Sequence, residues 1–177
     1  ATIQRALDQV VAQMSTWTDG SDLARFNRAA PGSWCELPEA FFTVLSTGLR
    51  VAQASDGAYD PASGAIVNLW GFGPSPRYTD AGFTPPAAEA IDAARECAGW
   101  RELAVDAPTR RVLQPGGATL DLSAIAKGFG VDEVVRALRQ RGVESCLVEV
   151  GGERLDHALP RLWAGDGHVD GVGVLLA

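Results

Sequence analysis

The sequence has few basic residues and almost no lysine. Its 15 Lys and Arg residues are outnumbered by 22 Asp and Glu residues, which gives a net charge of -7 over 177 residues. An acidic surface repels phosphate backbones and anionic lipid headgroups, so binding to nucleic acid or to a membrane surface through bulk charge is excluded. Lys127 is the only lysine, which raises the question of what that position does.

Cysteine is also scarce, and long apolar runs are missing. Cys35, Cys97 and Cys146 form no C-x-x-C pair, so nothing supports a thiolate metal site or a thioredoxin-like motif. Cys97 and Cys146 lie among apolar residues and are predicted to be small buried side chains, whereas Cys35 is expected in a loop. No apolar run reaches the ~18–20 residues that cross a bilayer. The first residues are expected to form a helix, and their pattern is not that of a signal peptide.

The composition is that of a folded protein, with 46% hydrophobic and 21% charged residues. The length predicts one domain. Apolar spacing of the helical kind covers residues 1–15, 38–55 and 86–98, and a cap at Ser123 and a stop at Gly142 predict a further helix over 123–141. Short runs that read as strands of a β-meander cover 102–106, 110–114 and 118–122, and a further strand covers 144–150. Residues 17–27 and the Gly/Pro/Ser-rich stretch 56–86 are expected to be loops. This order predicts an α+β fold.

One candidate site lies where a predicted strand meets a helix. Asp121 ends the strand, Ser123 is expected to cap the helix, and Lys127 follows one turn later. Free N–H groups at the helix start, together with the lysine, would suit an anion such as phosphate. From the residues alone, the favoured alternative is an ordinary capped helix with Lys127 on its solvated face.

A second candidate is the segment Ser55-Asp56-Gly57-Ala58-Tyr59-Asp60-Pro61. Gly57 permits a positive φ and a close approach of the backbone to a ligand. Asp60 precedes a proline, so extended geometry is expected to project its carboxylate from the turn. The alternative, a plain turn after a helix, is favoured for this segment taken by itself.

Aromatic and glycine-rich positions supply three weaker signals. Trp70 and Phe72 alternate with glycines and suit either stacking on a planar ring or a hydrophobic plug beneath a loop. Trp17 could stack on a ligand, although an ordinary core tryptophan is the commoner case. Gly151 and Gly152 could let a ligand approach a strand end, or could simply form a turn.

The order of these segments is more specific than any one of them. It resembles the ApbE family, the flavin transferases that use FAD to attach FMN to proteins. The matching segments are MSTW, SDLARFN, SDGAYDP, NLWGFGP, DLSAIAKGFGVD and LVEVGGE. The resemblance covers about residues 1–153 and leaves 154–177 as a divergent tail. It implies a mixed β-sheet packed with helices, in an ApbE-like (T-fold-like) domain that is apparently truncated here.

The resemblance also implies an activity and a setting. Family members bind FAD with Mg2+, cleave its pyrophosphate, attach FMN to a Thr or Ser of a target protein and release AMP. Many are lipoproteins or secreted proteins on the periplasmic side of the inner membrane, and their acceptors include subunits of membrane redox complexes. Envelope location, a lipid anchor on the full-length protein and such an acceptor are therefore expectations for this chain.

Site residues follow from the resemblance position by position. Those implied to contact FAD are Trp17, Ala58, Tyr59, Asp60, Asp121 and Lys127. Ala124 matches a metal-ligating position, which for alanine means its backbone carbonyl. Carbonyl and carboxylate oxygens suit Mg2+, and aromatic rings suit a flavin. The resemblance assigns no catalytic side chain.

The sequence also departs from the family pattern. A Thr-Met-Gly-Thr segment expected before the first helix is absent, as is the His-x-x-Asp-Pro-like motif of the C-terminal half with its acidic Mg2+ ligands. The hypothesis is an internal fragment, or a reading frame that departs near Arg154. His157, Asp166, His168 and Asp170 do not supply that motif and receive no role. Two other functions stay open: an FAD pyrophosphatase, and a non-catalytic FAD-binding envelope protein.

Overall fold

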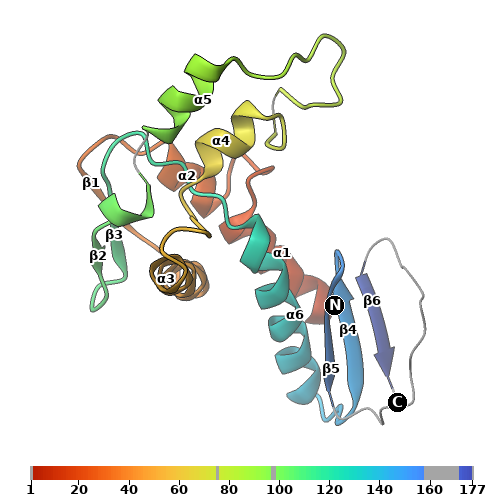
Figure 1. Ribbon diagram of the computed structural model, residues 1–177. Coiled ribbons are helices and arrows are strands. Elements are labelled where there is room, and N and C mark those ends of the chain that lie inside the picture. Colours follow the sequence, from red (N-terminus) through yellow and green to blue (C-terminus); the bar gives the residue numbers. More distant parts are fainter. Residues whose placement is uncertain (1, 75, 97–98, 158–171, 177) are drawn as a thin grey trace. The chain divides into compact units, whose positions relative to one another are not determined.

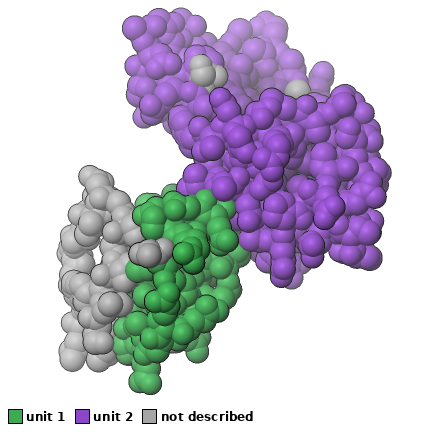
Figure 2. Space-filling view, turned by 180° about the vertical axis from the view of Figure 1, so that it is seen from behind, with its two compact units in different colours: residues 1–10, 124–177 green, residues 11–123 purple. Residues whose placement is uncertain are grey.

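The computed structural model describes residues 2–74, 76–96, 99–157 and 172–176. The chain divides into two compact units, each described by itself below. The larger unit is residues 11–123, and the smaller unit combines residues 1–10 with residues 124–177 (Figure 2). Among the described residues, no helix combines the length and the apolar character that a membrane span needs.

Helices supply most of the regular secondary structure of the larger unit (Figure 1). They are α2 (Asp22–Asn27), α3 (Glu39–Ala54), α4 (Gly64–Leu69), α5 (Ala88–Arg95) and the 3-10 turn η1 (Trp100–Glu102). The longest, α3, confirms the helix predicted over 38–55. Its Phe41, Val44, Leu45 and Ala52 are buried, because spacings of three and four residues place them on one face.

A small antiparallel sheet completes the larger unit. Its strands are β1 (Ser33–Glu36), β2 (Val105–Asp106) and β3 (Arg111–Gln114), in the order β1-β3-β2. The predicted pairing of β2 with β3 is confirmed. The loop expected around Cys35 is wrong, because Cys35 lies in β1 opposite Val112. Cys35 is a free thiol whose pKa burial raises above its ordinary value.

Three other sequence expectations for this unit are wrong. The stretch 56–86 is not all loop, because residues 64–69 form α4. Residues 22–27 form α2 rather than a loop, because Ser21 caps the helix and Leu23 and Phe26 are buried beneath it. Residues 118–122 form no strand of a meander. Their one ladder contact is an isolated parallel bridge between Thr119 and Ser63. Their other backbone bonds include those to the carbonyl of Pro61 and to the side chains of Asn27 and Gln114.

The smaller unit packs helices against a hairpin sheet. It contains α6 (Ser123–Arg139) and the first part of α1 (Thr2–Met14), with β4 (Cys146–Val150), β5 (Glu153–His157) and β6 (Val172–Leu176). The sheet is antiparallel in the order β5-β4-β6. Its core joins α6 to β4 through Val131, Val134, Val135, Leu138, Cys146 and Val148, with Ile3, Ala6 and Leu7 of α1 packed against it.

The smaller unit bears out several expectations from the sequence. The helices predicted over 1–15 and 123–141 and the strand over 144–150 are all present. Cys146 is a buried free cysteine, as predicted. Cys97, together with Asp166, His168 and Asp170 of the tail, lies outside the described residues, and so does the side chain of His157.

Candidate functional site

The loop after α3 has the backbone geometry that its sequence predicts. Gly57 has φ +83° and its N–H donates to the carbonyl of Ala52 at 2.8 Å, so the helix ends in a left-handed turn. Asp56 also has a positive φ, of 49°. This turn presents Ala58, which is exposed, and carries the chain directly into Tyr59 and Asp60.

Asp60 does not project freely from this loop, which corrects the expectation from its place before Pro61. Its Oδ1 accepts the N–H of Ala62 at 2.7 Å, and its Oδ2 accepts the N–H of Trp100 at 3.5 Å. A carboxylate that bonds the backbone two residues later is a common turn device, which competes with outward projection. Asp60 therefore ties the loop to η1.

Asp121 is held beside the same loop. Its N–H donates to the carbonyl of Pro61 at 2.9 Å, and its Oδ1 accepts the N–H of Ser123 at 2.7 Å. The carboxylate thus satisfies one of the free N–H groups at the start of α6. Ser123 is the first helical residue rather than the cap that the sequence suggested.

Tyr59 lies close enough to both carboxylates for their charges to affect it. Its hydroxyl is buried and has no hydrogen-bond partner among the described residues. Burial, and then the negative charges of Asp121 and Asp60, raise the pKa of Tyr59 to about 12. The structure therefore brings together three of the predicted site residues. A buried phenolic O–H without a partner is a donor ready for an acceptor oxygen of a ligand.

This geometry makes a prediction about the ionisation of Tyr59. In a Tyr78→Phe variant, which leaves one tyrosine, the phenol should ionise near pH 12, and Asp121→Asn should lower that pKa. Because folding raises the pKa above its ordinary value of 10, the stability gained from the neutral phenol is complete below pH 10 and is lost as the pH rises towards 12. Phenolate absorbance during an alkaline titration measures it. If Tyr59 ionised near pH 10 in the Tyr78→Phe variant, both with and without Asp121→Asn, the arrangement of these three residues would be contradicted.

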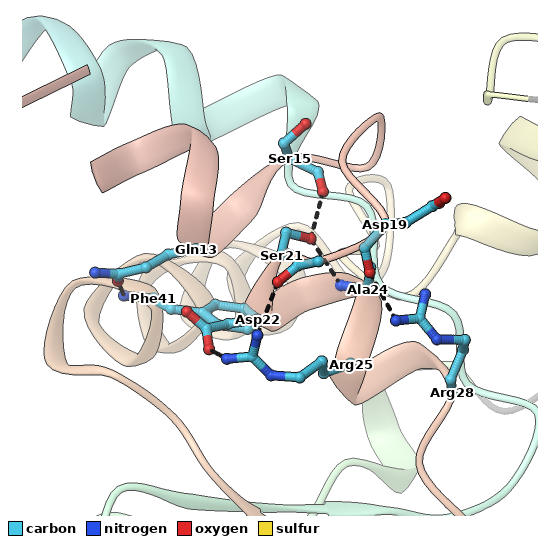
Figure 3. A network of polar contacts seen from close by, with 10 residues as sticks. Gln13, Ser15, Asp19, Ser21, Asp22, Ala24, Arg25, Arg28 and Phe41 are labelled. Carbon is cyan, nitrogen blue, oxygen red and sulfur yellow. Dashed lines mark hydrogen bonds and ion pairs between the residues drawn. The ribbon is translucent and has the colours of Figure 1, made fainter. Parts of the chain in front are cut away.

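The segment that carries Trp17 is braced by a polar network (Figure 3). The hydroxyl of Ser21 donates to the carbonyl of Ser15 at 2.7 Å and accepts the N–H of Ala24 at 3.0 Å. Trp17 itself is 54% exposed, which excludes the core alternative. The guanidinium of Arg77 lies 5.3 Å from the centre of its ring. Trp17 thus offers an aromatic face at the surface of the larger unit.

The aromatic residues of the NLWGFGP segment also lie at the surface. Trp70 is 39% and Phe72 62% exposed, so they do not form a plug beneath the loop. The ring of Phe72 lies 5.2 Å from that of Tyr78. Gly71 is required there, because it has φ +73° and a Cβ would lie 2.4 Å from the backbone nitrogen of Tyr78.

Two residues that hold the backbone of the segment leading to Asp121 have no role in the sequence predictions. Asn27 accepts the N–H of Leu120 at 2.8 Å and donates to its carbonyl at 3.0 Å. Gln114 is buried and donates to the carbonyls of Phe26 and Ala118. Asn27 is the last residue of the SDLARFN segment, and the match of that segment to the ApbE family was the one sign in the sequence of a role for Asn27.

Lys127 and Ala124 belong to the smaller unit. Both are exposed on α6, Ala124 in its first turn. The ammonium of Lys127 donates to the carbonyl of Gly151, in the turn between β4 and β5, at 3.3 Å. This contact joins two segments that the sequence singled out separately. Contact of one FAD with these residues as well as with Tyr59, Asp60 and Asp121 stays a prediction.

The described residues do not by themselves complete a magnesium site. No group of three or more His, Cys, Asp or Glu side chains in the described part of the chain could hold a metal ion. Both oxygens of Asp60 and one of Asp121 already accept backbone N–H groups. The remaining oxygen of Asp121 offers one ligand, whereas Mg2+ takes six oxygens, several of them usually from water and from substrate phosphates.

The succession of segments has a counterpart in known proteins. The ApbE family matches residues 1–158, which is most of the chain. The chain belongs to the ApbE family. The site residues predicted from the resemblance, Trp17 to Lys127, all lie within the matched range.

Relatives of the ApbE chain are named as flavin transferases. FAD:protein FMN transferases from Vibrio cholerae and Klebsiella pneumoniae are each 37% identical, over 85% and 86% of this chain. The one from Escherichia coli K12 is 35% identical over 85% of it. The chain spans 44%, 43% and 42% of these relatives, which is less than half of their length.

Solved structures agree with the fold. The flavin transferase ApbE from Vibrio cholerae superposes with a TM-score of 0.82 at 35% identity, over 90% of this chain and 50% of that one. The ApbE protein from Thermotoga maritima gives 0.76 at 26% identity, over 86% and 48%. The predicted α+β, ApbE-like fold is thereby confirmed. It corresponds to about half of the longer chain in each of these relatives.

Proposed function

We propose that this chain is the FAD-binding portion of an FAD:protein FMN transferase. The observation that carries the proposal is the buried, unpartnered hydroxyl of Tyr59 beside Asp60 and Asp121, in a chain whose relatives bear that name. A protein built to hold a ligand leaves such a donor free for the ligand's acceptor atoms.

The proposed reaction transfers FMN through its phosphate. The hydroxyl oxygen of a Thr or Ser in the acceptor protein attacks the phosphorus on the FMN side of the FAD pyrophosphate. The bond from that phosphorus to the bridging oxygen breaks, AMP leaves with the bridging oxygen, and the hydroxyl proton is released. Phosphoryl transfer of this kind depends mainly on positioning and on stabilising negative charge.

The residues of the chain have distinct tasks in this proposal. Tyr59 donates a hydrogen bond to an acceptor oxygen of FAD, and Trp17 offers its exposed ring for stacking on a planar ring of the cofactor. Lys127 places a positive charge against phosphate. Asp60 and Asp121 hold the loop backbone in position through their hydrogen bonds.

Magnesium has no step in this proposal, because the described residues do not fit a complete site for it. Mg2+ dependence, a membrane redox subunit as acceptor, a lipid anchor and an envelope location stay predictions from the resemblance. The proposal depends on Tyr59, Trp17 and Lys127, so it can be tested with and without the metal.

Covalent labelling of an acceptor tests the proposal. The chain is incubated with FAD, a candidate acceptor protein and either Mg2+ or a chelator, and covalent flavin is detected by in-gel fluorescence and intact mass. We expect the acceptor to gain the mass of FMN less water, and an acceptor with its Thr or Ser replaced by Ala to gain nothing. Bound FAD without label, under either metal condition, would contradict transfer, and AMP release without label would indicate a hydrolase.

A further inference from the structure

The only lysine of the chain rests on a glycine turn. Gly151 and Gly152 form the two-residue turn between Val150 of β4 and Glu153 of β5, and both have positive φ, of 56° and 91°. Two positive φ values in a two-residue hairpin turn are the geometry that glycine serves best. The carbonyl of Gly151 accepts the hydrogen bond from the ammonium of Lys127 at 3.3 Å.

The stem of the lysine makes a second contact with the same residue. A Cβ built on Gly151 would lie 3.2 Å from Cδ of Lys127, closer than ordinary van der Waals contact. A Cβ built on Gly152 would meet nothing within 4 Å. Lys127 therefore passes close over the Cα of Gly151 and not over that of Gly152, and a Cβ on Gly151 would make its stem shift by a few tenths of an ångström.

We propose that Gly151 is a positioning residue for Lys127, holding the ammonium where it meets an anionic group of FAD. This inference rests on the proposed function. A free lysine side chain populates many rotamers, and binding a ligand would have to restrict them. The glycine turn removes part of that cost in advance, because it leaves room for the stem and offers a carbonyl to the ammonium.

The two glycines provide a matched pair of variants. Gly151→Ala and Gly152→Ala both place an alanine at positive φ in the same turn, and the control carries the larger φ. Both variants and the wild-type chain are compared in the rate at which an N-hydroxysuccinimide ester acylates Lys127. Because Lys127 is the only lysine, peptide mass spectrometry separates its label from that of the chain's α-amine. The FAD dissociation constant and the unfolding temperature are measured on the same samples.

We expect Gly151→Ala to speed acylation of Lys127 several-fold and to weaken FAD binding several-fold, while Gly152→Ala matches the wild type in both. Gly151→Ala should also add nothing to the loss caused by Lys127→Ala, because a residue that acts through Lys127 has no effect in its absence. Equal acylation rates in all three proteins, or equal changes in both alanine variants, would overturn the inference. If the wild type binds no FAD, the proposed function fails, and the acylation rates still decide whether Gly151 positions the lysine.

Discussion

Replacing Gln114 by alanine is expected to lower the free energy of unfolding of the larger unit by about 3 kcal/mol, because each buried group left without a partner costs ~1–3 kcal/mol. Gln114 is only 2% exposed. Its amide donates to the carbonyls of Phe26 and Ala118, and its Oε1 accepts the N–H of Gly116. Alanine would leave three backbone groups without these bonds.

Chemical denaturation followed by intrinsic tryptophan fluorescence measures this loss. Gln53→Ala is the matched control, because Gln53 lies exposed on α3 and the same atoms are removed from a solvated position. We expect the control to stay within about 0.5 kcal/mol of the wild type. Equal stability of the two variants would show that Gln114 does not hold the backbone around Ala118.

Replacing Asn27 by alanine is expected to affect both stability and FAD binding. The amide of Asn27 bonds both backbone groups of Leu120, so its loss should cost about 2 kcal/mol. Asp121 follows directly and would lose its fixed place beside Pro61 and Tyr59. We expect FAD affinity to fall about tenfold, equivalent to ~1.4 kcal/mol.

Arg28→Ala serves as the control for Asn27→Ala. Arg28 caps the same helix, but its guanidinium bonds the carbonyl of Asp19, away from Leu120. Denaturation and FAD titration are run on both variants below their unfolding temperatures. If the Asn27→Ala protein is as stable as the wild type and binds FAD as tightly, Asn27 does not hold Asp121 in place.

The sequence predicted the elements whose signal is long and periodic. Apolar residues at helical spacing revealed α1 and α3, because these helices run for 13 and 16 residues, and end signals at Ser123 and Gly142 revealed the 17 residues of α6. By contrast, α2 has six residues and β1 has four, which is too short for a period to stand out. The partner of β1 is β3, far along the chain, and local sequence carries no sign of that pairing.

The error at 118–122 has a different cause. The run does alternate in burial as a strand would, since Ala118, Leu120 and Leu122 are all buried. Alternate burial shows which side chains face inward, but not which groups satisfy the backbone. Here the amide of Asn27 and the carbonyl of Pro61 take the place of a neighbouring strand.

The candidate site was predictable in its residues more than in its geometry. The matching segments named Tyr59, Asp60 and Asp121, and the structure brings these three together. The bonds that occupy Asp60 come from Ala62 and from Trp100, forty positions later in the chain. Long-range contacts of this kind depend on tertiary packing, so the sequence alone could not show that this carboxylate is engaged.

Protection of Lys127 by FAD would show that the chain binds FAD through this residue. Amine acylation of the wild-type chain is followed with increasing FAD, and the label on the single lysine is compared with that on the α-amine as an internal reference. If the chain binds FAD through Lys127, acylation of the lysine slows with saturation while that of the α-amine does not, and AMP or FMN alone protects less. An unchanged rate at Lys127 under FAD concentrations that saturate binding would contradict the account.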